Sequence, residues 1–133
     1  MKINIEVSCG ELIDKLTILS IKQEKITDVQ KLKNITKEKS SLEIIAQKLK
    51  TTNEKEYEKF FHQLQEVNKE LWDIEDKIRK LEMKKDFSEH FIQLARSVYI
   101  TNDERFKIKN TINSFFHSEM KEEKEYEKYN NEN

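Results

Sequence analysis

The stretch ARSVYITNDERFKIKNTIN holds the densest group of side chains that could do chemistry in this 133-residue sequence. Arg105 and Lys109 are four residues apart, which places them on one helix face, and two such cations suit a phosphate or carboxylate group. Arg96 could complete an anion-holding corner with them. A structural interpretation stays open, in which Asn102 and Asp103 stabilise a helix start and the cations form a solvated face.

Acidic side chains form a second group near the N-terminus. Glu11 and Asp14 are three residues apart, and Lys15 lies on much the same helix face. The same E-x-x-D spacing recurs at Glu70 and Asp73, and two such pairs facing each other could hold Mg²⁺. The spacing is common in any acid-rich helix, however, and the second pair is divided between two faces. We therefore predict no metal site and no cofactor.

A tryptophan marks a third group. Trp72, Asp76, Arg79 and Met83 follow one another at i, i+4, i+7 and i+11, so they share one helix face. If other helices cover that face, Asp76 and Arg79 become partly buried and need partners or a function. A functional site and a structural ion pair beneath the tryptophan both fit this pattern.

Nucleophilic catalysis has little support in the sequence. His62, His90 and His117 lack the spacing of helical metal ligands, and Cys9 has no suitably placed histidine. No glycine-rich phosphate loop is present either. Whether the protein is an enzyme stays open, and a non-enzymatic function is preferred.

The composition predicts an all-α protein. Hydrophobic residues make up 35% and charged residues 38%, and the chain has one glycine and no proline. This balance suits long helices with solvated flanks better than a thick core. The net charge of −1 gives no general attraction for nucleic acid. One cysteine fits a reducing cytoplasm, and no apolar run is long enough to enter a membrane.

Five helix-start signatures follow one another along the chain, each with a capping residue three positions before Glu or Gln. They begin at Ser8, Thr27, Thr51, Asp86 and Thr101. The expected helices cover about 9–26, 28–50, 51–85, 86–100 and 101–118. Gly10 lies in the first of these turns, where we expect it to allow close packing against the N-terminal strand or Trp72.

The third expected helix carries a coiled-coil seam of about four heptads. Its apolar residues are Tyr57, Phe60, Leu64, Val67, Leu71, Ile74, Ile78 and Leu81. A weaker seam on the second helix predicts an antiparallel, coiled-coil-like hairpin between the two, extended by the other helices to a five-helix bundle. Pairing of the same seams between two subunits is the alternative.

The first seven residues alternate as a short β-strand would, with Ile3, Ile5 and Val7 on one side. The strand could pair with SVYIT at 97–101 or with its copy in a second subunit. We predict a single helical domain over 1–118, followed by an acidic polar tail over 119–133 that is frayed or disordered.

Three segments resemble a family of short bacterial and phage proteins of unknown function: VSCGELIDKLTILSIKQEKI, VNKELWDIEDKIRKLE and FIQLARSVYITNDERFKIKNTIN. Members look like stand-alone helical proteins or domains beside tetratricopeptide repeats and sugar-transfer proteins. The resemblance implies a helical fold, no particular activity, and a link to cell-surface polysaccharide assembly. The residues that typify it are Glu11, Asp14, Lys15, Lys22, Trp72, Asp76, Arg79, Arg96, Asn102, Asp103, Arg105 and Lys109.

Two functions are therefore predicted. The first is a non-enzymatic cytoplasmic interaction or scaffold protein with a protein partner, which could be a second copy in a homodimer. The alternative is a small-ligand site, binding or catalytic, between the first, third, fourth and fifth helices. There a phosphate or carboxylate would meet Lys15, Arg79, Arg96, Arg105 and Lys109, with Glu11, Asp14, Trp72, Asp76, Asn102 and Asp103 as polar partners.

Overall fold

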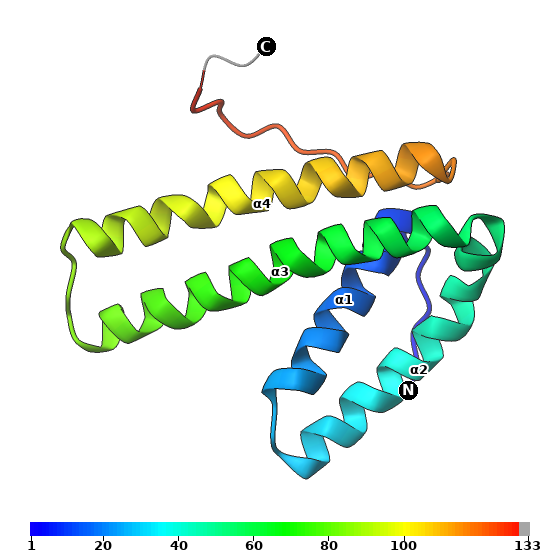
Figure 1. The fold of residues 1–133 in the computed structure, drawn as a ribbon, viewed down its shortest axis with the longest axis horizontal. Coiled ribbons are helices and arrows are strands. Elements are labelled where there is room, and N and C mark those ends of the chain that lie inside the picture. The colour runs from blue at the N-terminus through cyan, green and yellow to red at the C-terminus, as the bar shows by residue number, and fades with distance from the viewer. Residues whose placement is uncertain (131–133) are drawn as a thin grey trace.

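The computed structural model describes residues 1–130, and four helices make up its regular structure in that range (Figure 1). They are α1 (Cys9–Lys25), α2 (Val29–Thr52), α3 (Glu54–Met83) and α4 (Glu89–Phe115). The prediction of an all-α protein is confirmed. None of these helices combines the length and the apolar character that crossing a bilayer requires.

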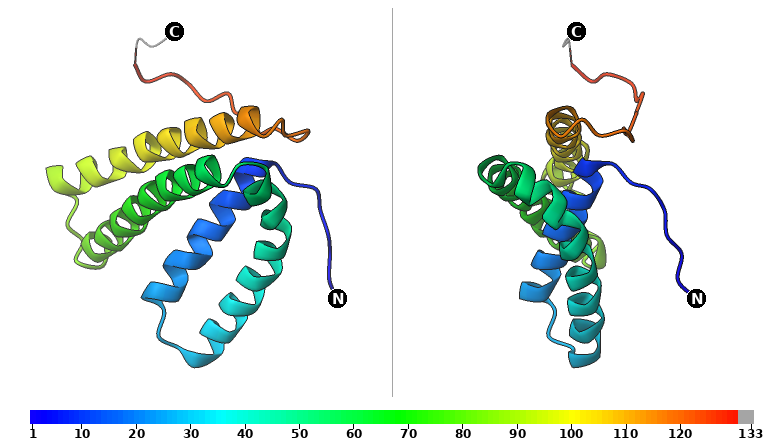
Figure 2. Two further views of the ribbon diagram at one scale, coloured as in Figure 1. Left: turned by 45° about the vertical axis from the view of Figure 1, so that its right-hand side comes forward. Right: turned by 90° about the vertical axis from the view of Figure 1, so that its right-hand side faces the viewer.

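The helices form two antiparallel pairs that diverge from a common end (Figures 1 and 2). The long helices α3 and α4 run side by side, and α1 and α2 form the shorter arm. α3 packs chiefly on α4 and α1, and least on α2. The predicted hairpin of the second and third helices is therefore wrong, because the α3 seam faces α1 and α4.

The hydrophobic core lies where the two arms meet, and α1 is its centre. α1 contacts each of the other three helices, which explains why its buried residues extend around most of its circumference. The main core cluster comprises Leu12, Ile13 and Leu16 of α1, Ala46 of α2, Tyr57, Phe60 and Leu64 of α3, and Ile112 of α4.

Side-chain caps begin the first three helices. The Ser8 hydroxyl accepts a hydrogen bond from the Glu11 N–H at 3.0 Å, as predicted. α2 and α3 start one and two residues later than expected, at the caps Asp28 and Asn53. Thr51 bonds back to carbonyls of α2, so it belongs to the end of that helix.

The predicted five-helix bundle is wrong, because the fourth and fifth expected helices are one continuous helix, α4. Thr101 lies in its interior and is buried, so its capping signature marks no helix start. No glycine or proline interrupts Glu89–Phe115, and the helical hydrogen bonds continue through the expected boundary. One consequence is that Asn102 and Asp103 lie mid-helix and cannot form an N-terminal cap.

The predicted N-terminal β-strand is also wrong for the isolated chain. Residues 1–7 are extended and exposed, and they form no sheet within the described part of the chain. The expected partner at 97–101 is helical, so its backbone groups are already paired. The alternating apolar pattern is present, but a strand needs a neighbour to which it can bond.

The chain after α4 runs back along that helix (Figure 1). Lys124 Nζ lies 2.5 Å from Asp103 Oδ1 and over the Phe106 ring, which ties this segment to α4. The division into a domain and a tail stays a prediction, and residues 131–133 of the predicted tail lie outside the described range.

Candidate functional site

A buried carboxylate joins α1 to α4 and α3. Arg105 binds Asp14 with both arms of its fork, Nε to Oδ1 at 2.9 Å and Nη2 to Oδ2 at 2.5 Å. The side chain of Asp14 is 1% exposed, and Asn68 Nδ2 donates to its Oδ1 at 2.8 Å. Asn68 also donates to the Thr17 hydroxyl at 2.9 Å. Every member of this network bonds to another member, as the burial of a charge requires.

The pKa of Arg105 is raised above its ordinary value. Its hydrogen bond to Asp14 is the main cause and outweighs the opposing effect of burial, with Glu11 and Glu122 adding to the increase. Arg105 therefore stays charged at neutral pH and offers no proton for acid–base chemistry.

Lys109, one helical turn further on, connects α4 to two acidic side chains. Its Nζ lies 2.7 Å from Glu11 Oε2 and 2.6 Å from Glu122 Oε2. The other oxygen of Glu122 accepts from the Ser8 hydroxyl at 3.0 Å. Burial by itself would lower the pKa of Lys109, but the two carboxylates outweigh it and raise that pKa.

Gly10 lies against the backbone of α4 at this junction. A Cβ atom at this position would be 2.7 Å from the carbonyl oxygen of Lys109, closer than van der Waals contact allows. The N–H of Gly10 donates to Asn113 Oδ1 at 2.7 Å. Close packing explains this glycine, but its neighbour is α4 and not the N-terminal segment or Trp72.

An apolar hollow lies beside residues 1–7, with a volume of about 800 Å³. Its walls come from the N-terminal segment, α1, α2 and the start of the tail. Leu12, Leu42, Ile45 and Leu49 give the helical wall its apolar character. We refer to this hollow as the N-terminal groove.

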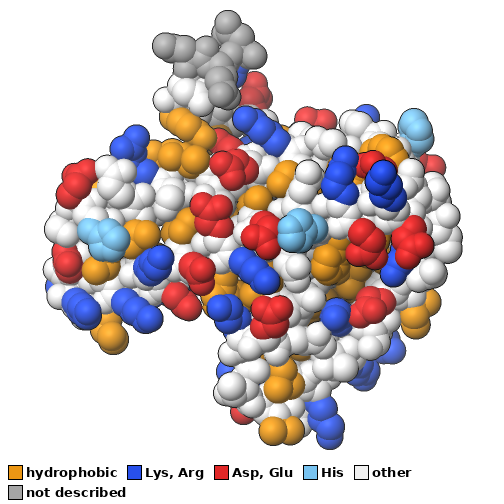
Figure 3. Space-filling view, viewed as in Figure 1, with side chains coloured by type: hydrophobic (Ala, Val, Ile, Leu, Met, Phe, Trp, Pro, Cys, Tyr) orange, Lys and Arg blue, Asp and Glu red, His pale blue; other side chains and the backbone are white. Residues whose placement is uncertain are grey.

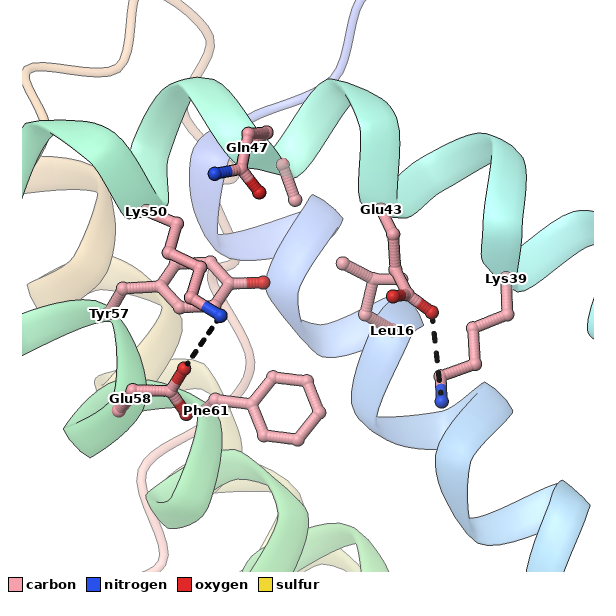
Figure 4. A pocket seen from close by; sticks show the side chains of 9 residues that line it. Leu16, Lys39, Glu43, Gln47, Lys50, Tyr57, Glu58 and Phe61 are labelled. Atoms are coloured by element: carbon pink, nitrogen blue, oxygen red, sulfur yellow. Dashed lines mark ion pairs between the residues drawn. The ribbon is translucent and has the colours of Figure 1, made fainter. Parts of the chain in front are cut away.

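A smaller cavity of about 190 Å³ lies between α1, α2 and α3 (Figure 4). Lys50 pairs with Glu58 at 3.3 Å on one side, and Lys39 pairs with Glu43 at 3.7 Å on the other. Burial, followed by the charges of Glu58 and Glu43, raises the pKa of Tyr57 to about 12. The mouth is electrically balanced, so it has no strong preference for an anion or a cation.

The structure separates the sequence-predicted site residues into two groups. Glu11, Asp14, Arg105 and Lys109 come together at the α1–α4 contact, where they pair with one another or with the tail. Asp103 pairs with Lys124, and Asn102 is half-buried beside it. The hydrogen bond from Lys124 is the main cause that lowers the pKa of Asp103.

The remaining predicted residues lie elsewhere. Lys15 is exposed and pairs with Glu38 at 3.2 Å. Arg79 is exposed and pairs with Glu75 on its own helix. Asp76 and Arg96 are exposed and Trp72 is half-buried, so the expectation that other helices bury the charges beside Trp72 is wrong. α3 packs chiefly on α4 and α1, and no further helix among the described residues covers the face that carries Asp76 and Arg79.

Several residues of the α1–α4 contact were missed from the sequence. Asn68 directly follows a seam position of α3. A polar residue beside an apolar seam was the one sequence feature that could have indicated its burial. Asn113 is almost fully buried, and within the described residues its Nδ2 has no hydrogen-bond partner. Glu122 accepts from Ser8, the cap of α1, and Ser118 accepts from the N–H of Cys9, each across more than 100 residues of sequence, a separation that no local pattern spans.

Comparison with known proteins decides the family. A sequence model of a family of unknown function, DUF6165, matches residues 1–131. The chain belongs to this family. The expectation of an uncharacterised family is confirmed, whereas the bacterial and phage origin and the neighbouring proteins stay predictions. No curated protein and no solved structure matches the chain. The matched range includes the N-terminal segment and the chain that follows α4.

Proposed function

We propose that this protein is a non-enzymatic helical interaction module, which docks an extended apolar segment of a partner protein between residues 1–7 and the α1–α2 arm. The observation that carries the proposal is the exposure of Ile3 and Ile5, at 79% and 78%. Both line the N-terminal groove, where an added segment would cover them. Exposed apolar surface of this kind marks protein-interaction sites.

The backbone of residues 1–7 supports the same proposal. These residues make no hydrogen bond or ion pair among the described contacts, so their N–H and C=O groups are available on both edges (Figure 2). An extended segment with free edges accepts another strand by backbone hydrogen bonding, while alternate side chains enter the groove.

The charged cluster favours a structural role over a ligand site. Arg105 and Lys109 are each satisfied by internal carboxylates, so an anion would have to displace Asp14, Glu11 or Glu122. The small-ligand alternative stays a prediction without a specific observation in its favour. Basic and acidic side chains are interspersed over the face in Figure 3, which gives no support to nucleic-acid binding.

Two finer parts of the proposal concern the location of the protein and the process in which it acts. A cytoplasmic location is supported by the single cysteine, Cys9, which is a free thiol. The link to cell-surface polysaccharide assembly comes from the resemblance alone and stays a prediction.

Site-specific photocrosslinking in the host cell tests the proposal. A photoreactive residue at Ile45, in the wall of the groove, should give a discrete crosslinked product. The matched control is the adjacent Ile44, which is 76% exposed but lies outside the groove. Strong crosslinking at Ile45 with little at Ile44 supports docking in the groove. Equal crosslinking at both positions, or none at either, contradicts it.

A further inference from the structure

We propose that the docked partner is a second copy of this chain, and that Met1–Val7 of the two copies pair as antiparallel strands about a two-fold axis at Asn4. The inference rests on the proposed function and names its partner. It is carried by the self-complementary order of charges and apolar side chains in the seven-residue segment.

Charge complementarity selects the register. When the axis passes through Asn4, each residue i faces residue 8 − i of the other copy. Lys2 then faces Glu6 of the partner subunit, and the two-fold axis repeats this pair. Opposite charges directly across an antiparallel ladder stabilise it, whereas like charges destabilise it.

The same register aligns the apolar side chains. Ile3 faces Ile5 of the partner subunit, and odd-numbered residues of both copies share one face of the ribbon. Met1, Ile3, Ile5 and Val7 thus form a continuous apolar face, while the charged residues lie on the opposite face. A shift by one residue would mix the two faces and is disfavoured.

The helices supply the apolar surface against which a two-stranded ribbon can pack. An isolated pair of strands is marginally stable in water, and it needs an apolar surface against which to pack. The N-terminal groove offers Leu42, Ile45 and Leu49 of α2 beside the segment. The two-fold axis gives the ribbon one such groove from each copy, so the interface is closed and self-limiting.

A charge-exchange experiment tests the register. Lys2 and Glu6 are exposed and lie outside the helices, so Lys2→Glu and Glu6→Lys leave the helical fold intact, which circular dichroism verifies. Analytical ultracentrifugation then measures self-association. We expect a wild-type dimer, and a dissociation constant about 10- to 30-fold weaker for each single variant because two repulsive pairs replace two attractive pairs.

Restoring the charge pairs completes the test. An equimolar mixture of the two single variants should form a heterodimer, and the Lys2→Glu/Glu6→Lys double variant should form a homodimer of wild-type affinity. Single variants that associate like the wild type overturn the register. A wild-type monomer whose Ile45 crosslinks to a different protein overturns the second-copy proposal and leaves the docking surface. A wild-type monomer without any Ile45 crosslink overturns both proposals.

Discussion

The Asp14 carboxylate is buried, so its negative charge needs a partner inside the protein. Arg105 supplies the positive charge that pairs with it. Arg105→Ala should reduce the free energy of unfolding by about 3–5 kcal/mol, since it leaves an unpaired buried charge. Urea denaturation followed by circular dichroism measures this loss.

Arg79→Ala is the matched control for this prediction. It removes an exposed arginine that pairs with Glu75 on the same helix, and it should change stability by less than about 1 kcal/mol. If both variants lose the same stability, the buried network has no special structural role.

Position 10 requires glycine because a side chain there would clash with the backbone of α4. Gly10→Ala should destabilise the protein by about 1–3 kcal/mol, because the new Cβ would meet the Lys109 carbonyl at 2.7 Å. At an open helical position the same change stabilises the protein. The sign of the stability change therefore shows whether Gly10 is closely packed against α4. Thermal and urea unfolding measure it, with the exposed Ser40→Ala on α2 as a control. A stabilised Gly10→Ala protein would refute the close α1–α4 contact.

Tyr57 makes the free energy of unfolding depend on pH in the alkaline range. Its pKa is about 12 in the folded protein, against about 10 in the unfolded chain, so between these values the folded state holds the extra proton. Stability therefore falls as the pH rises through this window. The raised pKa of Lys109 acts in the same direction from about pH 10.4 upward.

Urea denaturation at a series of pH values checks this prediction. The Tyr57→Phe variant should lose stability less steeply between about pH 10 and 12 than the wild type. Identical pH slopes for the two proteins would show that Tyr57 ionises equally in both states.

At the scale of elements, the chain after α4 acts as a strap on the α1–α4 contact. Glu122→Gln should cost about 1.5–3 kcal/mol, because Glu122 bridges buried Lys109 and Ser8. Glu127→Gln, at an exposed position of the same segment, should cost less than about 0.5 kcal/mol. Denaturation of both variants at neutral pH measures the difference, and equal costs would show that this segment contributes nothing specific.

The elements also show what sequence patterns can predict. The Ser8 cap and the buried seam positions of α3 follow from local spacing, and both were predicted correctly. The break at Thr101 was wrong because a capping signature permits a helix start without requiring one, and nothing in α4 stops the helix. The α2–α3 pairing was wrong because a seam shows which face is buried, but not which helix covers it.

At the scale of the whole molecule, the candidate site was only partly predictable. Local spacing singled out Glu11, Asp14, Arg105 and Lys109, but it could not show that they pair with one another across the α1–α4 contact. Glu122 reaches that group because the chain after α4 runs back along the helix, which no local spacing indicates. The alternating pattern of residues 1–7 predicted a β-strand that the described residues do not form, because alternation alone cannot show whether a partner strand is present.

Hydrogen exchange of residues 2–7 tests the central claim, that this segment finds its partner strand in another molecule. Mass spectrometry would follow the N-terminal peptide over about a hundredfold range of protein concentration. We expect its amides to exchange freely in dilute protein and to become protected as the concentration rises, while protection within α1–α4 stays constant. Free exchange at every concentration would contradict pairing between copies.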